Sequence, residues 1–234
     1  MLEVKNLTAG YGDIVAVRDL TFSLQAGKIL ALMGANGAGK STTLMALFGL
    51  VDRKLGSIIM NGEDISASKV EDRISKGLAI VPEGRRLFPD LTVSENLVVG
   101  GHIAKTAKMS AVIDMVYEYF PRLAERRAQL AGSLSGGEQQ MLAMGRALIS
   151  EPSILVVDEL SLGLMPKVVD ECYLVLEKLK AENIGVLLVE QNTERVFSAA
   201  DDVIVLEAGN VIWSGSAINA KENPSLRKSL MGLN

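Results

Sequence analysis

The sequence predicts an α/β fold with a mostly parallel sheet, an antiparallel β layer at the N-terminus and an inserted α-helical subdomain. Three observations lead to this prediction. Beyond residue 150, strand-length apolar runs alternate with helical patterns, which is typical of a parallel sheet. Residues 2–33 instead follow one another as strands separated by turns, which indicates an antiparallel meander. Between these parts, residues 91–150 show helical periodicity and few strand-like runs.

Length and composition limit the class of protein. The chain has 234 residues, of which 48% are apolar and 22% charged, close to the average of globular domains. Its longest apolar runs have the length of strands and fall far short of the ~20 residues that span a bilayer. The net charge of −4, without a basic stripe, argues against nucleic acid as a partner. The single histidine, His102, excludes mechanisms that need a histidine pair or a histidine-rich metal site.

The N-terminal layer is predicted from short apolar runs separated by turn residues. Strands are expected over residues 2–7, 14–17, 20–24, 28–33 and 57–60. Ala26-Gly27 provides the turn into the fourth of these strands. Asn61-Gly62 follows the last one and indicates a hairpin at the edge of the layer.

A glycine-rich segment follows the strand that ends at Met33 and precedes a helix expected from Lys40 to about Leu50. It fits the pattern G-x-x-x-x-G-K-[ST] and, with the next residue, gives the predicted site Gly34, Ala35, Asn36, Gly37, Ala38, Gly39, Lys40, Ser41 and Thr42. Glycines let consecutive N–H groups point at phosphate oxygens, and the helix N-terminus adds its dipole. The lysine reaches the β and γ phosphates, and the serine hydroxyl binds Mg²⁺. The pattern therefore predicts a nucleotide site, with an accidental match as the alternative.

A second segment suited to anions lies inside the helical stretch. Leu134-Ser135-Gly136-Gly137-Glu138-Gln139-Gln140 opens a helix that runs toward Ala147. Ser135 is a good N-cap, and the N–H groups that follow it form an anion site. A capped helix without a ligand is the alternative. The chain then has two helix starts of this kind.

The strand expected over residues 154–157 leads into two carboxylates, Asp158 and Glu159. Charged residues at the carboxyl end of a buried parallel strand emerge where α/β sheets bind ligands. Asp158 is therefore expected to hold Mg²⁺ through its water shell, and Glu159 to orient and polarise the attacking water. A helix-capping acid pair is the alternative interpretation.

The remaining elements complete the α/β core. They are a strand over 78–81, a helix over 167–181, a strand over 186–189, a helix over 194–199 and strands over 203–206 and 211–213. We expect one domain over residues 1–234. Within it, residues 1–90 and 151–234 form a nucleotide-binding core, and about 91–150 form the helical subdomain.

With both motifs in this order, the sequence resembles the ATP-binding-cassette (ABC) ATPases, P-loop NTPases with a RecA-like core, over nearly the whole chain. The resemblance implies that two such domains pack head to tail around ATP. Ser135, Gly136 and Gly137, with Glu138 in the same signature, would then face the ATP bound by the partner, and an isolated chain should hydrolyse poorly. Tyr11 matches the aromatic residue that stacks on adenine in the family, with an ordinary strand-end tyrosine as the alternative.

Two segments depart from the general family pattern. Glu83, after the strand over 78–81, stands where most members have glutamine, and Gln191 stands in place of the switch histidine. Both segments resemble the ATPase subunits of branched-chain amino-acid importers. Glu83 is expected either to approach Mg²⁺ or to be a solvated loop acid. Gln191 donates an N–H but cannot carry a proton at neutral pH, so catalysis falls to Glu159. Leu160 replaces the usual proline, which allows a looser loop over 161–164.

The resemblance implies an ATP-hydrolysing subunit that powers an ABC importer for branched-chain amino acids, with Mg²⁺ as cofactor. Its implied partners are a second ABC ATPase subunit, identical or related, two transmembrane permease subunits and an external substrate-binding protein. The implied location is cytoplasmic, peripheral on the inner face of the cell membrane. Two alternatives stay open: the same role for another cargo, such as urea or short amides, and a catalytically weak nucleotide switch.

Overall fold

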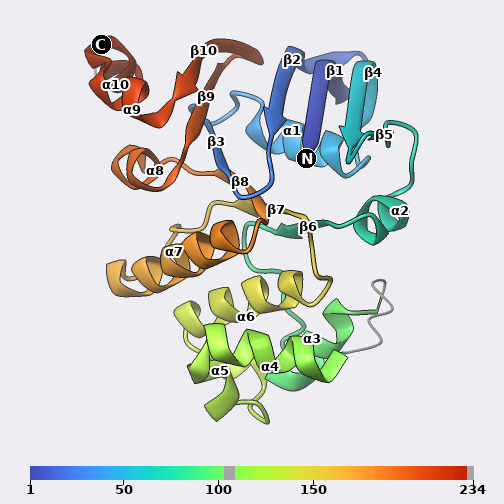
Figure 1. The fold of residues 1–234 in the computed structure, drawn as a ribbon, viewed down its shortest axis with the longest axis vertical. Coiled ribbons are helices and arrows are strands. Elements are labelled where there is room, and N and C mark those ends of the chain that lie inside the picture. The colour runs from blue at the N-terminus through green and yellow to red at the C-terminus, as the bar shows by residue number, and fades with distance from the viewer. Residues whose placement is uncertain (103–108, 231–234) are drawn as a thin grey trace.

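The computed structural model describes residues 1–102 and 109–230, which form two sheets and the helices around them (Figure 1). The first sheet is antiparallel and contains β1 (Leu2–Tyr11), β2 (Ile14–Leu24), β4 (Asp52–Met60) and β5 (Glu63–Asp64). Its strand order is β2-β1-β4-β5. This sheet is the N-terminal β layer that the sequence predicts.

The second sheet is mostly parallel. It contains β3 (Ile29–Met33), β6 (Leu78–Val81), β7 (Ile154–Asp158), β8 (Gly185–Val189), β9 (Asp202–Glu207) and β10 (Asn210–Ser216) in the order β10-β9-β3-β8-β7-β6. Only the pairing of β10 with β9 is antiparallel within the described sheet. Every residue of β3, β7 and β8 is buried, as expected for parallel strands with both faces covered.

Ten α-helices and one 3-10 turn accompany the two sheets in the described residues. They are α1 (Lys40–Leu47), α2 (Val70–Ser75), α3 (Val93–Gly100), α4 (Met109–Tyr119), α5 (Pro121–Glu125), the 3-10 turn η1 (Ala131–Ser133), α6 (Gly136–Leu148), α7 (Pro166–Ala181), α8 (Thr193–Ala199), α9 (Ala217–Glu222) and α10 (Pro224–Leu230). In Figure 1, α3 to α6 gather at one end of the molecule, away from the antiparallel sheet. None of the described helices combines the length and the hydrophobicity needed to cross a membrane.

Two apolar clusters fill the interior on opposite faces of the parallel sheet. Alternate residues of β3 divide between them: Ala31 and Met33 pack with α6 and α7 residues, whereas Leu30 and Leu32 pack with the antiparallel sheet and α1. This alternation follows from the two-residue period of a strand. The mostly parallel sheet with its N-terminal β layer and its group of helices confirms the predicted fold class.

Several elements differ from the sequence prediction. The two strands expected over 14–17 and 20–24 are the single strand β2, because Arg18 and Asp19 lie in a register shift against β1, between the pairs Leu7–Leu20 and Ala9–Val17, and the strand continues through it. The strand expected over 57–60 is longer, because β4 starts at Asp52, and the expected hairpin at Asn61-Gly62 is present: it joins β4 to β5 at the edge of the sheet. The helix expected to reach Leu50 ends at Leu47.

Candidate functional site

The glycine-rich loop joins the end of β3 to the start of α1. Gly34, Gly37 and Gly39 have positive φ angles of 149°, 78° and 107°, which residues other than glycine rarely adopt. A Cβ atom on Gly34 would lie 2.3 Å from the carbonyl oxygen of Leu206, and one on Gly39 would lie 2.8 Å from that of Ala16. The loop therefore needs glycine at both positions, because neighbouring backbone approaches them closely.

Lys40 is the first residue of α1 and is only 6% exposed. Its Nζ donates to the carbonyl oxygens of Gly34, at 2.8 Å, and Ala35, at 3.1 Å. The ammonium group is thus held by its own loop beside the helix N-terminus. A fixed positive charge next to helix N–H groups is suited to phosphate oxygens.

A cavity of about 520 Å³ opens beside this loop. It is lined by Ala16, Asn36, Gly37, Gly39, Lys40, Ser41, Thr42, Glu83, Glu159, Leu162 and Gln191. Segments that follow β3, β6, β7 and β8 therefore meet at one edge of the sheet. Glu83, Glu159 and Gln191 come from three of these segments, and the structure brings them together with the glycine-rich loop.

Two of the lining residues were not predicted. Ala16 lies on β2, and its carbonyl oxygen is the group that approaches Gly39. Leu162 is 58% exposed in the loop between β7 and α7. Neither residue belongs to a recognisable pattern, since both reach the cavity only because β2 and this loop pack beside the glycine-rich loop.

Glu159 and Gln191 form a direct pair in the cavity. Gln191 Nε2 donates to Glu159 Oε1 at 2.6 Å and to Asn36 Oδ1 at 3.2 Å. The backbone N–H of Glu159 also donates to the carbonyl oxygen of Val189, at 2.9 Å, and Glu159 has a positive φ of 54°. The carboxylate is therefore oriented by an amide that can donate but cannot accept a proton.

Asp158 lies at the end of β7 and is 8% exposed. Burial, followed by the charges of Glu83 and Glu159, raises the pKa of Asp158 to about 6, and the positive charge of Lys40 offsets part of this shift. Asp158 thus lies near two other carboxylates and one lysine. Such an arrangement is suited to a further cation, because added positive charge would relieve the repulsion between the carboxylates.

The residues expected to hold Mg²⁺ are Ser41, Asp158 and Glu83. Among the described residues, no group of three or more His, Cys, Asp or Glu side chains is arranged to hold a metal ion by itself. This matches the behaviour of Mg²⁺, which usually keeps several waters and is held by one or two carboxylates together with substrate phosphates. The residues present fit a magnesium ion that arrives with a nucleotide.

The segment Ser135–Glu138 forms the N-terminus of α6. Ser135 is the N-cap: its Oγ accepts from the N–H of Glu138 at 3.3 Å, and Glu138 Oε2 accepts from the N–H of Ser135 at 2.9 Å. Arg126 Nε holds the same glutamate at 2.6 Å. Burial opposes ionisation of Glu138, but these hydrogen bonds outweigh it and lower the pKa of that carboxyl. The first α-helical hydrogen bond of α6 is donated by the N–H of Gln139 to the carbonyl oxygen of Ser135. The N–H groups of Gly136 and Gly137 come before it and have no partner within the helix.

The structure does not bring this segment to the cavity. Within the described parts of the chain, none of Ser135, Gly136, Gly137 and Glu138 lines the space beside the glycine-rich loop. Tyr11 does not line it either: its side chain lies at the end of β1, opposite Ile14, and is 53% exposed. The two predicted anion sites of one chain are therefore separate.

The loop that follows Leu160 is held more firmly than the sequence suggests. Its side chain is fully buried in the larger apolar cluster. The next residue, Ser161, is also held, because its N–H and its hydroxyl both donate to Glu190, at 3.0 and 2.9 Å. The start of the loop after Glu159 is thus fixed in two ways, by the burial of Leu160 and by the hydrogen bonds of Ser161.

A glycine-rich loop between a parallel strand and a helix, with a lysine at the helix start, defines a P-loop nucleotide-binding protein. The comparisons with known proteins agree. The ABC transporter family model matches residues 17–161. The high-affinity branched-chain amino acid transport ATP-binding protein BraG of Pseudomonas aeruginosa is 43% identical over 232 residues, which cover 99% of this chain and 100% of that protein.

A second relative is the probable branched-chain amino acid transport ATP-binding protein LivF of Archaeoglobus fulgidus, 34% identical over 100% of this chain and 99% of its own length. A solved structure of an ATP-binding subunit of an ABC transporter superposes with a TM-score of 0.86 at 29% identity and covers 100% of this chain and 97% of the other. The chain belongs to the ABC transporter family, as an ATPase.

Proposed function

We propose that this chain is the ATP-hydrolysing subunit that powers an ABC importer for branched-chain amino acids. The observation that carries the catalytic part is the pairing of Glu159 with Gln191, at 2.6 Å, in the cavity beside the glycine-rich loop. The cargo is inferred from two relatives, 43% and 34% identical over nearly their whole length, whose names give branched-chain amino acid transport.

The residues divide the chemistry of ATP hydrolysis among them. The loop N–H groups and Lys40 bind the β and γ phosphates, and Tyr11 stacks on the base. A water molecule attacks the γ-phosphorus, and the bond to the bridging oxygen breaks, so that ADP leaves with that electron pair. Glu159 orients the water and takes its proton, since the amide of Gln191 has no site for one. Gln191 holds the carboxylate in place.

The residues of this site would hold a magnesium ion together with the nucleotide. When bound, Mg²⁺ neutralises negative charge on the β and γ phosphates. The Ser41 hydroxyl and the Asp158 carboxylate would hold it, with Glu83 nearby as a further carboxylate. The raised pKa of Asp158, about 6, agrees with this role, because burial and the charges of Glu83 and Glu159 make its charged form unfavourable without a cation.

The catalytic site is completed by a second subunit. The separation of Ser135, Gly136, Gly137 and Glu138 from the cavity supports an arrangement in which they face the ATP held by a partner ATPase, identical or related. The further partners are two transmembrane permease subunits and an external substrate-binding protein. The ATPase then lies on the cytoplasmic face of the membrane.

The Glu159→Gln variant tests the catalytic assignment. In the transporter assembled with its permease subunits, turnover should fall on the order of 10²–10⁴-fold, because the general base is lost. Binding of ATP should persist, since the glycine-rich loop and Lys40 are unchanged. The matched control is Glu63→Gln. This substitution removes an exposed carboxylate on β5 that pairs with Lys76. Retention of most turnover in the Glu159→Gln variant would remove Glu159 from this role.

Two further outcomes bear on the alternatives. A wild-type ATPase pair that releases no phosphate above background would favour a nucleotide switch, against which the retained Lys40, Asp158 and Glu159 argue. Proteins that copurify with the chain from membranes identify the cargo class. A binding-protein partner specific for urea or short amides would contradict the amino-acid assignment.

A further inference from the structure

A buried glutamate lies between the ends of β7 and β8 and has no part in the chemistry described above. Glu190 follows β8 directly and is 1% exposed. Its carboxylate accepts from the N–H and the hydroxyl of Ser161, at 3.0 and 2.9 Å, and from the N–H groups of Gln191 and Asn192, at 2.9 and 3.2 Å. A buried carboxylate is costly unless hydrogen-bonded, and four donors meet that requirement here.

These hydrogen bonds connect the two loops that carry the catalytic pair. Ser161 lies two residues beyond Glu159, in the loop after β7, and Gln191 lies in the loop after β8. The Gln191 side chain returns to Glu159 at 2.6 Å, and the Glu159 N–H reaches the Val189 carbonyl at 2.9 Å. Glu190 thus closes a ring of hydrogen bonds around the pair.

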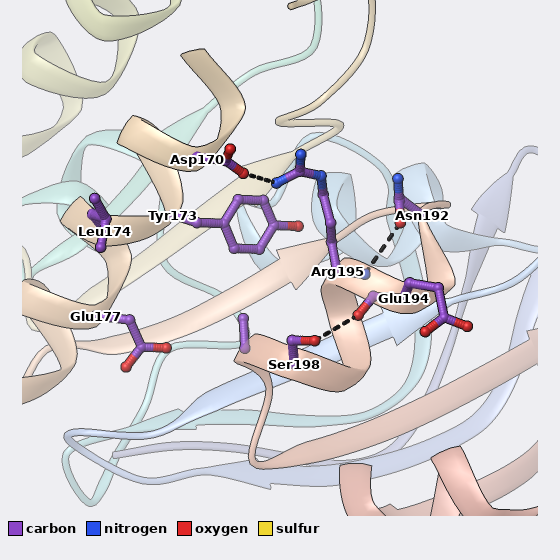
Figure 2. A pocket seen from close by; sticks show the side chains of 9 residues that line it. Asp170, Tyr173, Leu174, Glu177, Asn192, Glu194, Arg195 and Ser198 are labelled. Carbon is purple, nitrogen blue, oxygen red and sulfur yellow. Dashed lines mark hydrogen bonds and ion pairs between the residues drawn. The ribbon is translucent and has the colours of Figure 1, made fainter. Parts of the chain in front are cut away.

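Three backbone N–H groups and one hydroxyl, and no cation among the described residues, hold this carboxylate. Figure 2 shows the groove between α7 and α8, where Arg195 turns to Asp170, at 2.6 Å, and lies 5.7 Å over the ring of Tyr173. The Asn192 side chain, in the same view, caps α8 by accepting from the Arg195 N–H at 3.1 Å. Within the described residues, Glu190 forms no ion pair. The groups that donate to Glu190 belong to the loops after β7 and β8, so its hydrogen bonds fix the position of one loop against the other.

We propose that Glu190 is a positioning residue that fixes Gln191 against Glu159 by clamping the loop after β8 to the loop after β7. The inference rests on the proposed ATPase function and deepens it. Glutamine is a poor replacement although it has the same size, because one of its two terminal atoms is a donor and would face an N–H or O–H that already donates. The Glu190→Gln variant therefore changes the clamp and leaves the volume of the side chain intact.

Kinetics of the assembled transporter give the first test. In Glu190→Gln, kcat should fall on the order of 10–100-fold, because a small displacement of catalytic groups has effects of this size. The KM for ATP should stay within about twofold, since the phosphate loop is untouched. Ser161→Ala removes only one of the four donors and should lower kcat less, whereas Ser161→Thr keeps the hydroxyl and should restore it. Glu194→Gln, on the exposed face of α8, is the matched control.

Amide hydrogen exchange on the full chain gives a readout that does not depend on activity. In Glu190→Gln and in Ser161→Ala, exchange of the backbone amide of residue 161 should accelerate. In Glu190→Gln, exchange should also accelerate at Gln191 and Asn192. Exchange within β8, which pairs with β3 and β7, should not change.

Three results would overturn the clamp. They are a raised KM with unchanged kcat, a kcat within about twofold of wild type in both variants, or unchanged exchange at Ser161. If Glu190→Gln fails to fold, Ser161→Ala decides by the same measurements. If the wild-type complex hydrolyses no ATP, the proposed function fails, and the exchange experiment still tests the clamp separately.

Discussion

At the carboxyl end of β7, Asp158 is buried where its negative charge is unfavourable. Burial and the neighbouring charges of Glu83 and Glu159 raise its pKa to about 6, above the value of about 3.9 expected in the unfolded chain. The folded state therefore binds a proton more tightly than the unfolded state does. Stability is lost as the pH rises from about 4 to about 6, and the loss is complete above that range.

Replacing Asp158 by asparagine should consequently stabilise the chain in the absence of nucleotide and Mg²⁺. At pH 8 the free energy of unfolding should increase by up to about 3 kcal/mol, whereas at pH 4 the variant and the wild type should differ little. Denaturant unfolding at both pH values measures the difference. Asp90→Asn, at an exposed loop position, is the matched control. The account would be contradicted if the difference in free energy of unfolding between Asp158→Asn and the wild type were no larger at pH 8 than at pH 4.

At the scale of elements, two helices begin with the same kind of cap. Thr92 caps α3 and Ser135 caps α6, each with a glutamate three residues later that completes a capping box. In the first, Thr92 Oγ1 accepts from the Glu95 N–H at 3.2 Å; in the second, Ser135 Oγ accepts from the Glu138 N–H at 3.3 Å. This similarity separates the cost of losing a cap from the cost of losing an ATP contact.

Thr92→Ala and Ser135→Ala should therefore destabilise the fold to a similar extent, each by about 0.5–2 kcal/mol in the free energy of unfolding. Only Ser135→Ala should lower ATPase turnover in the assembled pair, because its hydroxyl faces the partner's nucleotide in the proposed arrangement. Unfolding and turnover are measured on the same preparations. Equal losses of turnover in both variants would show that Ser135 acts only as a cap.

At the scale of the whole molecule, the fold presents two predicted anion-binding helix starts that do not meet. Lys40 lies at one and Ser135 at the other, and the described residues of the Ser135 segment stay outside the cavity. The loop beyond Glu159 carries exposed apolar side chains, with Leu162 at 58% and Met165 at 72%. Both features agree with a site completed by another subunit.

Complementation between two inactive variants tests this arrangement. Lys40→Ala and Ser135→Ala should each abolish turnover when assembled alone. If the two ATPase subunits are copies of this chain, a mixed pair contains one Lys40→Ala chain and one Ser135→Ala chain. Such a pair retains one intact site, built from the lysine loop of the Ser135→Ala chain and the serine segment of the Lys40→Ala chain. Random pairing should then restore about a quarter of the wild-type rate. The absence of restored turnover, with mixed pairs demonstrated, would place both residues in one chain's own site.

The sequence alone determined the features that depend on neighbours along the chain. The glycine-rich loop, the apolar strand that leads into Asp158 and Glu159, and the capped start of α6 are contiguous patterns, because local backbone geometry requires their residue types in that order. The alternation of strands and helices likewise predicted the parallel sheet. The fold class follows from this local information.

Only the tertiary structure decided how distant segments meet. The position of β4 inside its sheet, the approach of Ala16 to Gly39 and the burial of Leu160 have no signal in spacing. Gln191 hydrogen-bonds a residue 155 positions away, and Glu190 one that is 29 positions away. Such contacts depend on which strands pack side by side, and that order follows from burying apolar surface over the whole sheet.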